Sequence, residues 1–94
     1  MAKDSLETAR KEINEIDEAM AELFVRRMHA AEKVADYKRI HGLAILDEAR
    51  EAEVVKRNSA LIEEDEIREY YVRFLRNMME ISRDYQAKLI EDNK

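Results

Sequence analysis

The amino-acid sequence predicts an all-α protein, and three observations lead to this fold class. The 94 residues include a single glycine, Gly42, and no proline or cysteine. Most of the remaining residues are good helix formers, mainly alanine, glutamate, leucine, lysine, arginine and methionine. Apolar residues recur in steps of three and four, and no stretch alternates with the period of two that is typical of a strand. We expect a single domain over residues 1–94, built from three helices of long, short and medium length.

The first expected helix covers about residues 4–41 and carries one apolar seam along its length. Asp4, with Glu7 three residues later, has the form of a capping box, and Gly42 suits the left-handed residue that ends a helix. At 1.5 Å per residue the helix is roughly 55 Å long. A compact domain of this size has a radius of gyration of about 13 Å. The chain therefore cannot cover this seam alone.

Two further helices are expected, over about residues 47–63 and about residues 65–91. Asp47 and Asp65 stand where a side chain can cap the first turn of each helix. Two copies of the long first helix, lying alongside each other, would bury the surface that one chain leaves exposed. The unequal helix lengths therefore predict a homodimer.

Polar residues interrupt the apolar faces of all three expected helices. Arg27 occupies a seam position of the first helix, where a charge costs free energy unless an anion meets it. Lys38 follows eleven residues later and points the same way, because eleven residues span almost a whole number of turns. The other two helices contribute polar residues at helical spacings, namely Asp47, Arg50 and Glu51 on the second and Ser82 and Gln86 on the third.

Each of these residues also has a structural interpretation of its own. Arg27 can pair with a carboxylate, and Lys38 can be an ordinary exposed lysine near a helix end. Asp47 is a natural N-cap, and Ser82 can bond to its own helix backbone. Their coincidence on three helices instead predicts a pocket of cations, one acid and neutral donors. Such a pocket suits a small dianion and a reaction that needs electrostatic help rather than proton transfer.

Other classes of function are disfavoured by the composition. The net charge is −5 and basic residues are interleaved with acids, which argues against a nucleic-acid partner. No apolar run approaches the roughly 20 residues of a membrane span, and we expect no signal peptide and no membrane partner. The absence of cysteine fits a cytoplasmic location. No metal-ligand spacing, phosphate loop or nucleophile–base pair is visible, so we expect neither a metal nor a cofactor.

The residues that carry these charges resemble the all-helical chorismate mutases over about residues 5–90. Each motif is weak alone, but their order and spacing together are specific. Ala44 and Glu48 depart from the pattern, because family members often have proline there. The matching motifs are the 10–17 segment, Arg26-Arg27, Lys38, the Gly42-Leu43 turn, the 47–51 segment, and Ser82 followed by Gln86.

This resemblance implies an intertwined homodimeric helical bundle that converts chorismate to prephenate in phenylalanine and tyrosine biosynthesis. The reaction is a Claisen rearrangement, which makes the enzyme an isomerase that needs no cofactor and forms no covalent intermediate. The resemblance also implies a role for each residue. Arg10 and Arg27 would bind the carboxylates with help from Ser82, and Lys38 and Gln86 would hydrogen-bond the ether oxygen. Glu51 would hold the ring hydroxyl, and Asp47 and Arg50 would line and brace the pocket.

The spacing of two arginines supports shared sites. Arg10 and Arg27 are seventeen residues apart, which is about 25 Å along one helix and more than chorismate can span. If both serve one pocket, Arg10 comes from the partner subunit, and the dimer has two composite sites.

Three alternatives remain open from the sequence. An isochorismate-pyruvate lyase has a related fold, although Glu51 favours the mutase because the lyase substrate carries its hydroxyl elsewhere. A mutase for the amino analogue of chorismate is a second alternative. A non-catalytic dimerisation or regulatory module is the third, and it gives no reason for charges to face inward. Association with another shikimate-pathway enzyme also stays open, whereas a fused dehydratase or dehydrogenase domain is not expected.

Overall fold

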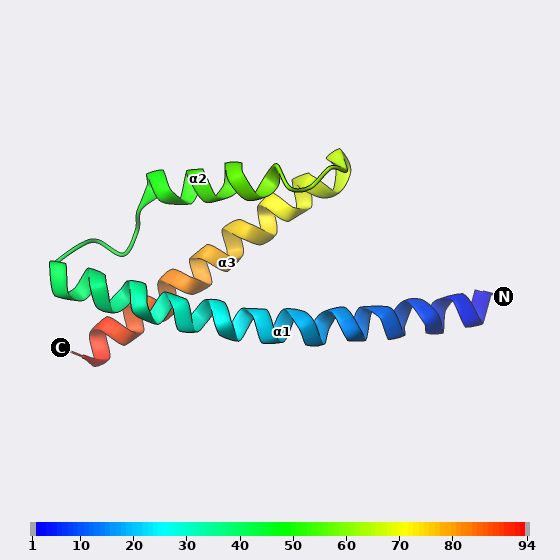
Figure 1. Ribbon diagram of the computed structural model, residues 1–94, viewed down its shortest axis with the longest axis horizontal. Coiled ribbons are helices and arrows are strands. Elements are labelled where there is room, and N and C mark those ends of the chain that lie inside the picture. Colours follow the sequence, from blue (N-terminus) through cyan, green and yellow to red (C-terminus); the bar gives the residue numbers. More distant parts are fainter. Residues whose placement is uncertain (1, 94) are drawn as a thin grey trace. The chain divides into compact units, whose positions relative to one another are not determined.

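The computed structural model describes the backbone of residues 2–93 and the side chains of residues 5–93. Within these residues it contains three helices and no strand, namely α1 (Ala2–His41), α2 (Glu48–Ser59) and α3 (Asp65–Asp92) (Figure 1). The predicted all-α class is confirmed. None of the described helices is both long and apolar enough to cross a membrane. The chain divides into two compact units, Met1–Ala30 and Ala31–Lys94, which are described separately below.

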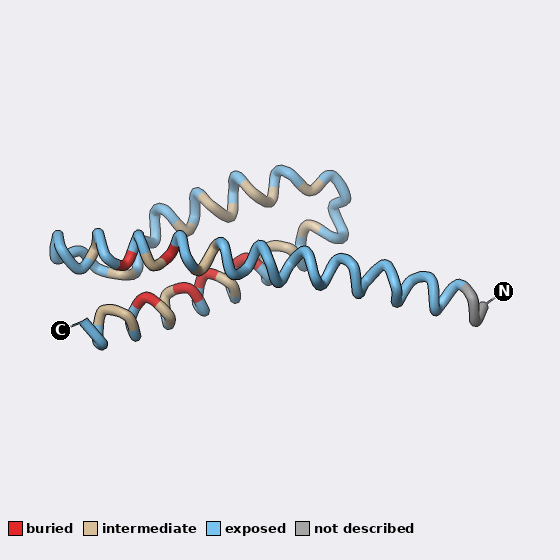
Figure 2. The backbone as a smooth tube through the Cα atoms, turned by 60° about the horizontal axis from the view of Figure 1, so that its bottom comes forward, coloured by how far each residue is buried: buried red, intermediate tan, exposed pale blue. Residues whose placement is uncertain are grey.

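The first unit is the N-terminal part of α1, and its apolar seam is uncovered. The large apolar side chains are close to half exposed, and Figure 2 draws this part of the tube almost entirely in pale blue. Because the helix begins at Ala2, the backbone of Asp4 lies inside it and not at the expected cap position. The side chain of Asp4 lies outside the described residues. The exposed seam residues include Leu6, Ile13, Ile16, Met20 and Leu23.

The second unit begins within α1 and contains the buried core. Figure 2 shows buried residues in red on both α1 and α3. The buried apolar residues are Ala31 and Ala35 on α1 and Leu75 and Met79 on α3. A hydrogen bond from the Tyr85 hydroxyl to Glu32 Oε2, 3.1 Å long, joins the two helices. Alanine side chains are small enough to let a neighbouring helix approach closely.

The end of α1 follows the sequence expectation. Gly42 has φ +64°, in the left-handed region. The N–H of Leu43 donates to the Lys38 carbonyl at 2.8 Å, and the N–H of Gly42 donates to the Arg39 carbonyl at 3.4 Å. This pair of bonds is the Schellman motif, which satisfies carbonyls that the helix itself leaves unpaired. The predicted stop at His41-Gly42 is confirmed.

The start of α2 also follows the expectation. Asp47 is the N-cap residue, with φ −126° and ψ 91°, and its Oδ1 accepts a 3.0 Å hydrogen bond from the Arg50 backbone N–H. The carboxylate thereby satisfies one of the unpaired N–H groups of the first turn and lies favourably at the positive end of the helix dipole.

The connection between α2 and α3 differs from the expectation in two ways. The second helix ends at Ser59 and not near residue 63. Beyond Ser59 the backbone forms tighter bonds, from the Leu61 N–H to the Asn58 carbonyl at 3.0 Å and from the Ile62 N–H to the Ser59 carbonyl at 3.1 Å. The guanidinium of Arg68 also donates to carbonyls of this connection, those of Ser59 at 3.2 Å and Ile62 at 2.9 Å. Asp65 is the first residue of α3 and not its cap, and it forms a 2.6 Å ion pair with Arg68.

We expect Gly42→Ala to destabilise the protein by about 1 kcal/mol, because a Cβ disfavours the left-handed conformation. A Cβ at this position meets no atom within 4 Å, so the loss comes from the backbone alone. Urea unfolding at equal protein concentration measures the effect. Gly42→Asn is the matched control and should lose less, since asparagine tolerates this conformation better. Equal stability of the alanine variant and the wild type would contradict the assigned role.

Candidate functional site

The most buried polar group of the second unit lies on α3. Ser82 and Gln86 have relative exposures of 6% and 7%, and Gln86 Nε2 donates to Ser82 Oγ at 3.1 Å. These residues continue the stripe that begins with Leu75 and Met79, because positions 75, 79, 82 and 86 follow helical spacing. The stripe therefore changes from apolar to polar along its length.

Gln86 holds an unpaired polar atom in this buried environment. Its Oε1 is buried and has no hydrogen-bond partner among the described residues. Leaving such a group unpaired costs about 1–3 kcal/mol. If the amide turns over, the Ser82 hydroxyl can donate to Oε1, and Nε2 becomes the unpaired donor. Either orientation leaves Gln86 with hydrogen-bonding capacity for another group.

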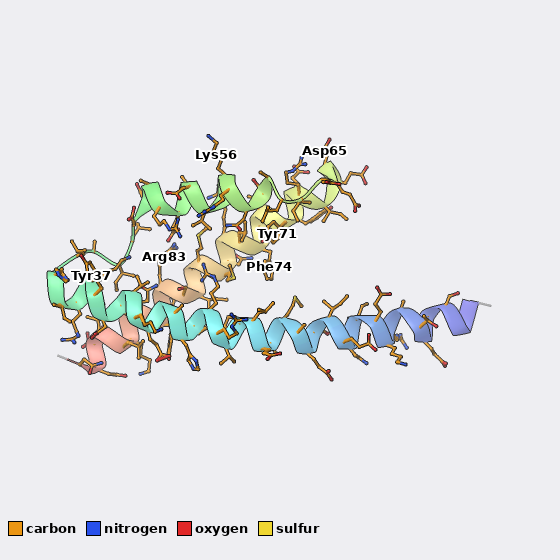
Figure 3. The ribbon with its side chains drawn as sticks, viewed as in Figure 1. Tyr37, Lys56, Asp65, Tyr71, Phe74 and Arg83 are labelled. Atoms are coloured by element: carbon orange, nitrogen blue, oxygen red, sulfur yellow. The ribbon has the colours of Figure 1, made fainter. Side chains whose placement is uncertain are left out.

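Glu51 on α2 meets a cation from α3. Nη1 of Arg83 donates to both carboxylate oxygens of Glu51, and the two side chains are 26% and 30% exposed. Arg83 projects from α3 toward α2 (Figure 3). The hydrogen bond to Glu51 raises the pKa of Arg83, although desolvation opposes the shift, and nearby Glu80 and Asp84 add to it. Arg83 therefore remains positively charged at neutral pH.

Arg83 is not among the residues predicted from the sequence. Its position directly after Ser82 is the one signal that could have drawn attention to it. Thirty-two residues separate it from Glu51, and helical periodicity says nothing about which acid on another helix an arginine meets. The structure supplies that pairing.

Lys38 lies near the loop that follows α1. Its Nζ donates to the Ile45 carbonyl at 2.5 Å, and the residue is half-buried. The loop is apolar in sequence, and beside it lies an open hollow of about 460 Å³. Two predicted residues therefore share one hollow, which is lined by Lys38, Leu43, Ala44, Leu46, Asp47 and Glu48.

Arg50 does not join these groups. Its Nη1 forms a 3.0 Å ion pair with Glu53 on the same helix, and both side chains are more than half exposed. Its backbone N–H, in contrast, is held by Asp47. The arginine that meets Glu51 is therefore Arg83, from another helix, and not its chain neighbour Arg50.

Arg10 and Arg27 belong to the first unit. Arg10 is exposed and Arg27 is half-buried. Both lie on α1, and the helical rise places them about 25 Å apart along its axis. One chain thus does not bring these two guanidinium groups together.

A second pairing outside the predicted residues links Tyr85 and Glu32. The hydrogen bond to Glu32 raises the pKa of Tyr85, and burial and the Glu32 charge raise it further. An open hollow of about 240 Å³ lies between α1 and α3 and includes Glu32, Asp36, Arg39 and Asn93 in its lining. None of the predicted site residues lines this hollow.

The second unit thus places two cations, one carboxylate and two neutral hydrogen-bonding groups on its three helices, namely Lys38, Arg83, Glu51, Ser82 and Gln86. Within the described residues, no group of three or more histidine, aspartate or glutamate side chains could hold a metal ion. Singly, such groups can bind an anion, accept a hydrogen bond from a hydroxyl or donate to an oxygen that gains charge. Among these five described residues, Lys38 alone lines the hollow beside the loop after α1.

Comparison with known proteins gives one match. The family model described as chorismate mutase type II matches residues 9–87. No curated protein and no solved structure matches the chain significantly. The matched range includes the eight site residues predicted from the sequence and also Arg83.

We expect the Tyr85–Glu32 bond to stabilise the fold below about pH 10, the ordinary pKa of tyrosine. The folded state raises the pKa of Tyr85, so the stabilisation is complete below the unfolded pKa and is lost as the pH rises through the folded value. Denaturant unfolding of the wild type and of Tyr85→Phe, from pH 7 to 11, measures this. The stability difference should be constant up to about pH 9 and shrink above pH 10. A difference that does not change with pH would contradict the assignment.

Proposed function

The chain belongs to the chorismate mutase type II family, and we propose that it catalyses the rearrangement of chorismate to prephenate. Chorismate carries two carboxylates and rearranges in one concerted step. The ether C–O bond breaks as a new C–C bond forms, so negative charge develops on the ether oxygen. A protein accelerates such a step by holding the compact conformer and by donating hydrogen bonds to that oxygen.

The buried Gln86 amide is the observation that carries this proposal. It is neutral, 7% exposed and fixed by Ser82, and one of its two polar atoms has no described partner. A ligand that meets this atom would remove the cost of burying it unpaired. With the amide turned over, Nε2 donates to the ether oxygen while Ser82 holds Oε1. Because an amide does not titrate, this donor works over a wide pH range.

Lys38 is proposed as the second donor to the ether oxygen. Its ammonium has three N–H groups, and one of them donates to the Ile45 carbonyl. That bond limits the rotation of the long side chain and leaves two donors for a substrate. A fixed positive charge stabilises the developing negative charge more than it stabilises the neutral ether.

The remaining roles follow the family resemblance. Glu51 accepts the hydrogen bond of the ring hydroxyl, and Arg27 is assigned to a substrate carboxylate. Ser82 is assigned to holding the Gln86 amide, which uses its one hydroxyl hydrogen. Asp47 lines the hollow that contains Lys38, which supports its assignment to the pocket wall. Arg50 is assigned to bracing the pocket. Its exposed ion pair with Glu53 supports a role on the outer side of the helix.

The active form is proposed to be a homodimer in which Arg10 of the partner subunit completes each site. The part of α1 that lies in the first unit has a half-exposed apolar seam, and contiguous apolar surface of this kind marks an interface. This seam supports the proposed homodimer. The 25 Å or so between Arg10 and Arg27 along the helix also supports it, since one small substrate cannot reach both on one chain. Cytoplasmic location remains part of this proposal.

We expect the wild type to convert chorismate to prephenate and Gln86→Ala to lower kcat/KM about 100-fold, as for the loss of one donor to a developing oxyanion. NMR identifies the product, and the rate at which it forms gives kcat/KM for the wild type and for the variant. The protein is also incubated with isochorismate. Formation of pyruvate and salicylate from isochorismate would instead indicate a lyase. No turnover of chorismate or of isochorismate would indicate a non-catalytic module.

Mixing inactive Arg10→Ala and Lys38→Ala chains should restore activity. A heterodimer of the two has one intact site, so random exchange restores about a quarter of the wild-type sites. Mixing Arg10→Ala with the Arg10→Ala/Lys38→Ala double variant is the matched control and restores none. Absence of recovery after subunit exchange has been shown by mass spectrometry would contradict shared sites.

A further inference from the structure

The ion pair between Glu51 and Arg83 adds a charge to the proposed site that no assigned role explains. Arg83 contacts both oxygens of the carboxylate that is proposed to hold the ring hydroxyl. We propose that Arg83 is a positioning residue for Glu51 and that its charge makes the site select a hydroxyl over an ammonium group. This inference rests on the proposed function, because it concerns the ring substituent of the same substrate.

The geometry allows Glu51 to bind Arg83 and a hydroxyl together. An ionised carboxylate has about four lone-pair positions, and one nitrogen of Arg83 occupies one position on each oxygen. The remaining positions can accept a substrate O–H. The pair also joins α2 to α3, and its side chains are about a quarter to a third exposed. A carboxylate held from another helix keeps one orientation, which a catalytic site needs.

The charge of Arg83 decides which ring substituent is favoured. A hydroxyl is neutral and needs only an acceptor. An amine in its place is protonated near neutral pH and gains most from a carboxylate whose charge is not offset. Arg83 offsets that charge and repels a second cation at short range. Glu80 and Asp84 also attract the guanidinium, but both are exposed and solvent screens them.

Other arginines near the pair do not replace Arg83. Arg50 precedes Glu51 in the chain, but its guanidinium is paired with Glu53. Arg76 lies two turns before Arg83 on α3 and is exposed. Arg76→Gln removes the same charge from the same helix without touching the Glu51 pair. It is therefore a matched control for any general effect of net charge.

The test compares kcat/KM for chorismate with kcat/KM for the analogue that has an amino group in place of the ring hydroxyl. Arg83→Gln should lower the preference for chorismate about tenfold or more, because the unpaired Glu51 attracts the ammonium group. Arg83→Lys should keep most of the preference but lower the rate, since lysine keeps the charge without the planar geometry of arginine. Arg76→Gln should change neither quantity.

A double-variant cycle separates positioning from direct contact with the substrate. If Arg83 acts through Glu51, then Arg83→Gln should change kcat/KM for chorismate less than about twofold in the Glu51→Gln background. An equal loss in both backgrounds would show that Arg83 touches the substrate itself and would overturn the proposal. Circular dichroism checks the fold, and Arg83→Met, which keeps the apolar stem, takes the place of the glutamine variant if that variant does not fold.

The two proposals can fail separately. If the wild type converts neither chorismate nor its amino analogue, the proposed function is overturned and, with it, the assigned selectivity. Conversion of chorismate by the wild type, with an unchanged preference in Arg83→Gln, overturns the role of Arg83 alone. A preference that falls equally in Arg76→Gln also overturns it, because the effect would then come from net charge.

Discussion

The buried stripe of α3 is the constraint on which the arrangement of the second unit depends. Leu75 and Met79 are apolar, whereas Ser82 and Gln86 continue the same stripe with hydrogen-bonding groups. Burial of the apolar half contributes free energy to folding, and the polar half costs free energy unless it is paired. One helix thus supplies both the core and the most buried candidate site residues. The amide of Gln86 is buried on the same stripe as the core residues and is hydrogen-bonded to Ser82.

The small core supports the proposed link between the candidate site and a homodimer. Among residues 5–93 only four apolar side chains are buried, and two of them are alanines. A core of this size does not supply the stability that a 94-residue domain needs. The long α1 meanwhile exposes a row of leucine, isoleucine and methionine side chains in its first unit. Both observations support the proposed homodimer, in which the surface that stabilises the fold also delivers Arg10 of the partner subunit.

The features of the candidate site that could be predicted from the sequence depend on local spacing. Ser82 and Gln86 are one helical turn apart, so their position on one face follows from the helix itself. The role of Asp47 as a cap also depends only on residues three positions away. Arg83 and Tyr85 were not predictable in this way. Their partners, Glu51 and Glu32, lie 32 and 53 residues away, and no rule of spacing connects them.

The sequence by itself determined the all-α class, the end of α1 directly before Gly42 and the cap of α2, because each depends on local backbone preferences. The tertiary structure decided the features that depend on the meeting of separate helices. It ended α2 at Ser59, whose carbonyl accepts a hydrogen bond from Arg68 of α3, and it paired Glu51 with Arg83 and not with the adjacent Arg50. The physical reason is that a long side chain bonds to whatever partner packing brings near it. Helical periodicity specifies the face of a residue but not the groups on the opposing helix.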